Sequence, residues 1–116
     1  FEFTLERVEP MINEVLKISN WNYSDIDFFV FHQANKFMID YLASKMKIPN
    51  DKVLYTIHKF GNTSSASIPL SITDQLQGKI NKKAFKIILV GYGVGYSFGT
   101  VGLTCGPIAL PKLVKI

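Results

Sequence analysis

The sequence predicts an α/β fold with a mostly parallel sheet and an antiparallel last strand. Two apolar runs, Phe28–Phe31 and Phe85–Val90, contain almost no polar residues, which is typical of strands buried on both faces of a parallel sheet. The segments between them carry apolar residues at helical spacing. The expected order is helix, strand, helix, strand, helix, strand, strand, and the last strand, Ser97–Thr104, turns back beside its predecessor.

Two helices are predicted before residue 50. The first is expected to begin at Pro10, because a proline is harmless at the first helical position, and to end near Asn20. The second is expected to run from about Asn35 to Lys47. Its inner side is predicted to carry five apolar residues: Phe37, Met38, Tyr41, Leu42 and Met46.

The middle of the chain is predicted to hold another strand and the third helix. Val53–Ile57 has the β-branched and aromatic composition of a strand. Gly61–Ser65 is interpreted as a tight loop that enters a helix continuing to about Gln77, with a kink near Pro69. Gly91–Gly95 is predicted to be a glycine-rich turn before the last strand.

Polar or glycine-rich segments follow three of the predicted strands. They are His32–Asn35, Gly61–Ser64 and Gly91–Gly95, and in open α/β sheets such strand ends gather at one edge, where sites form. A histidine and an asparagine facing one cavity supply two N–H donors for an oxygen that becomes negative during a reaction. Structural roles stay open at this point, since Asn62 could simply cap the following helix.

Composition excludes several classes of function. The 116 residues are 47% hydrophobic and 19% charged, which favours a folded core, and no apolar run approaches the roughly 20 residues that span a bilayer. The net charge of +4 is spread along the chain without a basic stripe that would indicate nucleic acid. Two histidines and one cysteine, far apart, give no metal-site spacing, and a strand after the glycine-rich turn argues against a dinucleotide fingerprint.

The single cysteine fits a reducing compartment, so a cytoplasmic location is expected. Cys105 lies after the last predicted strand with no activating sequence nearby, and we interpret it as a packed or partly exposed thiol. The chain starts at Phe1 without an initiator methionine or a signal-like segment, so we expect a further segment upstream.

Four motifs together resemble one family, the ketoacyl-acyl carrier protein synthase III enzymes. They are Asp25-Ile-Asp, His32-Gln-Ala-Asn35, Phe60-Gly-Asn-Thr-Ser-Ser-Ala-Ser-Ile-Pro69 and Gly91-Tyr-Gly-Val-Gly95. The resemblance covers nearly the whole chain and is to the C-terminal domain. It implies one half of a thiolase-like, five-layer αβαβα fold, with residues 1–116 as the C-terminal domain and the nucleophilic cysteine in an absent N-terminal half. It also implies that this chain alone is inactive.

The resemblance further implies the roles of individual residues. His32 and Asn62 complete a Cys-His-Asn triad and hold the malonyl thioester carbonyl during decarboxylation. The turn Gly93-Val94-Gly95 contributes a backbone N–H to a second oxyanion hole, although Val94 stands where the family usually has glycine.

The same resemblance implies substrates and partners. These are acyl-CoA and malonyl-acyl carrier protein, with no cofactor and no metal, in a homodimer of an acyltransferase of fatty-acid synthesis. The family often has a basic residue at the position of Phe37, so carrier-protein contact is expected through Lys36 and Lys45 on the second helix. Two alternatives stay open: a related condensing enzyme of secondary metabolism, and a non-catalytic interaction domain on the same fold.

Overall fold

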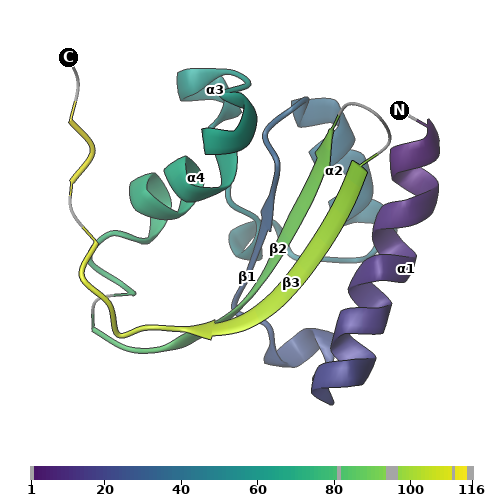
Figure 1. The fold of residues 1–116 in the computed structure, drawn as a ribbon, viewed down its shortest axis with the longest axis horizontal. Coiled ribbons are helices and arrows are strands. Elements are labelled where there is room, and N and C mark those ends of the chain that lie inside the picture. Colours follow the sequence, from purple (N-terminus) through teal and green to yellow (C-terminus); the bar gives the residue numbers. More distant parts are fainter. Residues whose placement is uncertain (1, 81, 94–96, 111, 115–116) are drawn as a thin grey trace.

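The computed structural model describes residues 2–80, 82–93, 97–110 and 112–114, which form three layers. Helices α1 (Glu2–Ser19) and α2 (Lys36–Lys45) cover one face of the sheet, and α4 (Ser67–Leu76) lies on the other (Figure 1). A one-turn helix, α3 (Ile57–Phe60), precedes α4, and short 3-10 turns lie at Tyr23–Asp25, Asn50–Lys52 and Ser64–Ala66. Within these residues, no helix is long and apolar enough to cross a membrane.

The sheet has three strands in the order β1 (Phe28–Phe31), β2 (Phe85–Gly93) and β3 (Ser97–Cys105). β1 and β2 are parallel, and β2 and β3 are antiparallel, which confirms the predicted antiparallel last strand. Neighbouring strand residues face opposite sides, and both sides are buried. Phe29 and Phe31 pack with α1 and α2, whereas Val30 packs on the α4 side.

The prediction that the first helix begins at Pro10 is wrong, because Pro10 lies inside α1. The buried stripe of α1 continues across the proline through Val8, Ile12 and Leu16, spaced by four residues, so packing on the sheet extends the helix toward the N-terminus. Pro10 itself is exposed. Water can therefore satisfy the carbonyl that the missing N–H leaves without a helical partner.

Helix α2 forms within two residues of its predicted bounds, but its buried face differs from the prediction. Asn35 caps the helix, since its side chain accepts a hydrogen bond from the backbone N–H of Met38. The buried side chains of this segment are Met38, Ile39, Leu42, Ala43 and Met46. Phe37 and Tyr41 are 66% and 45% exposed, so their assignment to the inner side is wrong.

The predicted strand Val53–Ile57 does not form. Val53 makes one isolated parallel bridge with Phe29, and the chain then turns into α3 at Ile57. Thr56 has ψ near −2°, which is outside the extended region, so no further ladder can follow.

The side chain of Gln33 replaces the missing strand ladder. This fully buried amide follows β1, and its nitrogen donates to the carbonyls of Phe31 (2.9 Å) and Leu54 (3.2 Å). Its oxygen accepts from the backbone N–H groups of Thr56 (3.0 Å) and Ile57 (3.1 Å). Four backbone groups that would otherwise be buried without partners are satisfied by one side chain.

The predicted third helix is confirmed as α4, but Pro69 lies in its first turn, where an N–H would have no helical partner, rather than at an internal kink. The predicted glycine-rich turn does not begin at Gly91, because β2 continues to Gly93. Gly91–Gly93 belong to β2 and pair with Ser97–Gly99 of β3.

Replacement of Gln33 by leucine tests the importance of its amide. Leucine is similar in size but leaves four backbone groups without a partner, so the free energy of unfolding should fall by about 3 kcal/mol or more. The matched control is Gln77→Leu, because Gln77 is exposed at the end of α4. Urea unfolding of both variants measures the difference, and equal stability of the two would contradict the role given to Gln33.

Candidate active site

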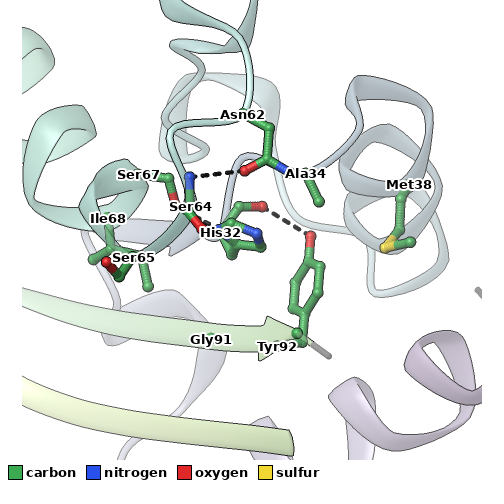
Figure 2. A pocket seen from close by; sticks show the side chains of 11 residues that line it. His32, Ala34, Met38, Asn62, Ser64, Ser65, Ser67, Ile68, Gly91 and Tyr92 are labelled. Atoms are coloured by element: carbon green, nitrogen blue, oxygen red, sulfur yellow. Dashed lines mark hydrogen bonds between the residues drawn. The ribbon is translucent and has the colours of Figure 1, made fainter. Parts of the chain in front are cut away.

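A pocket opens where β1 and β2 reach their carboxyl ends. Side chains and backbone from three separate segments line it: His32 after β1, Asn62 after α3, and Gly91–Gly93 at the end of β2 (Figure 2). The predicted convergence of these segments at one sheet edge is confirmed. Ser64, Ser65 and Ser67 complete the polar part of the wall, and Met38 and Ile68 contribute apolar surface.

His32 is held by contacts on its backbone and on its ring. Its N–H donates to the carbonyl of Val90 (2.9 Å), which extends the β1–β2 pairing by one residue. Its Nδ1 lies 2.5 Å from Oγ of Ser67. Burial lowers the pKa of the imidazole, so the ring is neutral at physiological pH.

Tyr92 fixes His32 from the opposite side of the pocket. The Tyr92 hydroxyl donates to the carbonyl oxygen of His32 (2.9 Å), and the two rings meet edge to face with centroids 5.3 Å apart. Burial raises the pKa of Tyr92, so the hydroxyl remains a donor. The imidazole therefore has one favoured orientation in the pocket.

Asn62 reaches the pocket from a sharply turned loop. Gly61 has φ of 67° and ψ of −158°, a conformation that is essentially restricted to glycine, and it ends α3. The side-chain oxygen of Asn62 accepts from the backbone N–H of Ser64 (2.9 Å). This bond assigns the oxygen to the loop and leaves the amide nitrogen, which has no partner among the described residues, on the pocket side (Figure 2).

The helix cap considered for Asn62 does not form, because α4 is capped at Ala66 and the 3-10 turn before it at Thr63, neither with a side-chain cap bond. The oxygen of Asn62 instead stabilises the loop that leads into this turn, as an aspartate oxygen would also do. The oxygen and the nitrogen are different atoms, so stabilisation of the loop does not compete with donation into the pocket.

The glycine-rich segment is described only in part. Gly93 lies at the end of β2 and lines the pocket, whereas Val94 and Gly95 lie outside the described residues. The backbone donor predicted for this turn therefore stays a prediction.

Three residues of the site were not singled out from the sequence. Gln33 and Tyr92 lie inside the motifs but were given no role, and Ser67 was part of the predicted helix. A signal for Ser67 exists, since Ser67 and Ser71 stand four residues apart and form a polar stripe on an otherwise apolar helix face.

Cys105 lies far from the pocket. It is the last residue of β3, where it pairs with Phe85, seven residues along β2 from Tyr92. At the rise of a strand this separation is about 23 Å. Cys105 packs against the core on the α4 side and cannot act together with His32 and Asn62.

Lys36 and Lys45 are exposed on α2, as predicted, and each has an acidic partner. Lys36 contacts Asp40 at 2.7 Å and Lys45 contacts Glu9 at 3.3 Å. The hydrogen bond from Lys36 lowers the pKa of Asp40, whose other oxygen accepts from the hydroxyl of Tyr55. Among the described residues, no group of three or more histidine, cysteine, aspartate or glutamate side chains is placed to hold a metal ion.

Comparison with known proteins agrees with this geometry. The fold is that of one part of a thiolase-like condensing enzyme. Residues 16–105 match the family described as 3-oxoacyl-[acyl-carrier-protein (ACP)] synthase III C terminal, and the chain belongs to this family.

Individual relatives give the same result. The chain is 40% identical over 99 residues to β-ketoacyl-[acyl-carrier-protein] synthase III of Clostridium novyi, which covers 85% of this chain and 31% of that protein. Its structure resembles 3-oxoacyl-(acyl-carrier protein) synthase from Burkholderia xenovorans with a TM-score of 0.89 and 39% identity, covering 92% of this chain and 31% of that one. The priming β-ketosynthase of the R1128 polyketide pathway is 28% identical, with a TM-score of 0.74 over 90% of this chain and 31% of that one. The chain therefore spans about a third of the length of these relatives.

Proposed function

We propose that this chain is the C-terminal domain of a 3-oxoacyl-acyl carrier protein synthase III, which condenses acyl-CoA with malonyl-acyl carrier protein in fatty-acid synthesis. The observation that carries the proposal is the meeting of His32 and Asn62 at one pocket. Each offers an N–H group there: a neutral imidazole and an amide whose oxygen is already occupied by the loop.

Two neutral donors suit the decarboxylation of a malonyl thioester. When the bond between the α-carbon and the carboxylate breaks, its electron pair moves toward the thioester carbonyl, and carbon dioxide leaves. The carbonyl oxygen becomes the negative oxygen of an enolate, which His32 and Asn62 stabilise by donating hydrogen bonds. The electrons come from the broken bond itself, so the step needs neither a metal nor a redox cofactor.

The enolate carbon then attacks the acyl group, which is carried as a thioester on a cysteine of the N-terminal half. A new carbon–carbon bond forms, and the cysteine leaves as a thiolate. Support for a nucleophile outside this chain is twofold: Cys105 lies about 23 Å from the pocket level along the strand, and the relatives are about three times longer. The turn Gly93-Val94-Gly95 is proposed to donate a backbone N–H to the acyl oxygen.

Carrier-protein contact is proposed for the outer face of α2, which we define as Lys36, Phe37, Tyr41 and Lys45. Lys36 lies next to the pocket wall formed by Ala34 and Met38. Asp40 is exposed and Glu9 is partly exposed. Ion pairs near the surface contribute little free energy, so acidic side chains of a carrier protein can replace these partners. The homodimer and the cytoplasmic location are proposed from the family resemblance.

A condensing enzyme of secondary metabolism is the second candidate, supported by the likeness to the polyketide priming enzyme. The match of residues 16–105 to the synthase III family, together with 40% and 39% identity to the two synthase III relatives described above, favours the first function.

Asn62→Asp in the full-length enzyme separates donation to the substrate from stabilisation of the loop. Aspartate keeps an oxygen for the N–H of Ser64, so stability should stay the same, but the donor is replaced by a negative charge. Malonyl decarboxylation should fall by about 10²–10³-fold or more, while acylation of the cysteine by acyl-CoA continues. Asn50→Asp, the same substitution at an exposed residue outside the pocket, is the control.

The decarboxylation assay is read beside urea unfolding and intact-mass measurement of the acyl-enzyme. Wild-type decarboxylation by a stably folded Asn62→Asp enzyme would reduce Asn62 to a loop-stabilising residue. Comparable loss in Asn50→Asp would show that the effect is not specific to the pocket.

Reversal of two charges tests the carrier surface. Lys36→Glu with Lys45→Glu should raise the KM for malonyl-acyl carrier protein about tenfold at low salt, because encounter with an acidic partner is disfavoured, and the effect should shrink as salt rises. The KM for malonyl-CoA, a substrate without a carrier protein, should not change. The control is Lys82→Glu with Lys83→Glu, which changes the net charge by the same amount. These two lysines lie three and two residues before the start of β2, at the end of the sheet opposite the pocket.

An unchanged KM for malonyl-acyl carrier protein in the Lys36 and Lys45 variant would show that the carrier protein does not dock on α2. An equal rise in the Lys82 and Lys83 variant would assign the effect to net charge rather than to α2.

A further inference from the structure

We propose that Ser67 is a positioning residue that fixes the tautomer of His32, by donating its hydroxyl proton to Nδ1 so that Nε2 carries the ring proton into the pocket. The geometric part of this inference stands on the described contacts alone. Its consequence for rate rests on the proposed function.

The direction of the bond follows from a count of protons. The Ser67 side chain is buried, with 1% of the residue exposed, and its oxygen has two partners: Nδ1 of His32 and the backbone N–H of Gln33 at 3.3 Å. The Gln33 N–H can only donate. The hydroxyl proton therefore has one acceptor among the described residues, which is Nδ1.

The opposite arrangement leaves a buried donor without a partner. If Nδ1 carried a proton, the oxygen of Ser67 would accept from both His32 and Gln33, and the hydroxyl proton would have no acceptor among the described residues. The same penalty applies to the imidazolium, in which Nδ1 is always protonated. The lowered pKa of His32, caused by burial, agrees with a neutral ring that accepts at Nδ1.

Ser67 is held in place by a second set of buried hydroxyls. Ser71, one turn later on α4, donates to the carbonyl of Ser67 (2.8 Å). Because that proton is used, the contact of 2.8 Å between Ser71 and Thr56 has Thr56 as its donor. Thr56 is in turn bonded through its backbone N–H to Gln33. The start of α4 is thereby tied to the residue that follows His32.

The consequence is a donor of defined position at Nε2. An imidazole that exchanged between tautomers would present an acceptor to the substrate oxygen for part of the time, and an acceptor repels the developing negative charge. A hydroxyl behind Nδ1 removes that state, much as outer-shell partners select the tautomer of metal-bound histidines.

The test is nitrogen NMR of the full-length enzyme labelled with ¹⁵N-histidine, with the His32 signals assigned by their absence in His32→Ala. The wild type should show one neutral tautomer, protonated at Nε2, with a titration midpoint below about 6.5. Ser67→Ala should show mixed or exchanging tautomers. Its kcat for malonyl decarboxylation should fall about ten- to a hundredfold, with KM little changed.

Thr73→Ala is the matched control, because it removes a hydroxyl that donates to the carbonyl of Pro69 on the same helix, without touching His32 or the hydroxyls that hold Ser67. It should leave the tautomer and the titration midpoint of His32 unchanged. Ser67→Thr, which keeps the hydroxyl, should restore the single tautomer.

Several results would overturn the proposal. A neutral wild-type His32 that is protonated at Nδ1 would overturn it, and this result does not depend on whether any variant folds. An unchanged imidazole spectrum in Ser67→Ala would also overturn it, and so would an equal change in Thr73→Ala. A different result would contradict the proposed function alone. In that case His32→Ala would still decarboxylate malonyl thioesters, while wild-type His32 would still be protonated at Nε2.

Discussion

The buried amide of Gln33 is the interaction on which the site depends. One side chain joins the end of β1 to the segment that enters α3, using both donor and acceptor atoms. His32 directly precedes Gln33, and Asn62 follows the segment that Gln33 holds. The positions of both proposed donors therefore depend on Gln33. A buried polar group that is fully satisfied rigidifies its surroundings, whereas a half-satisfied one would destabilise them.

Local patterns in the sequence were sufficient to predict most of the fold. The apolar runs of β1 and β2 and the bounds of α2, to within two residues, depend on neighbouring residues, and they were predicted correctly. The failures involve long-range packing. α1 extends past Pro10 because the sheet buries Val8, and Val53–Ile57 is not a strand because a side chain 20 or more residues earlier takes its hydrogen bonds.

The candidate site shows the same division. The meeting of His32 and Asn62 at one pocket was predicted, but Asn62 reaches it from the loop after α3 and not from a strand end. The contacts of Ser67 and Tyr92 with His32 join residues 35 and 60 positions apart, which local patterns cannot predict. Helical spacing alone also misplaced Phe37 and Tyr41, because Met38 and Leu42 belong to a stripe that continues through Ile39 and Ala43. The exposed aromatic residues that result lie between Lys36 and Lys45 on the proposed carrier surface.

The central claim is that His32 and Asn62 donate to the same oxygen. A crystal structure of the full-length enzyme with a stable malonyl thioester analogue tests it most directly. The thioester carbonyl oxygen should lie about 2.7–3.1 Å from both Nε2 of His32 and Nδ2 of Asn62, with the Asn62 oxygen still bound to Ser64. A carbonyl oxygen held by neither side chain, or an Asn62 amide turned with its oxygen toward the ligand, would contradict it.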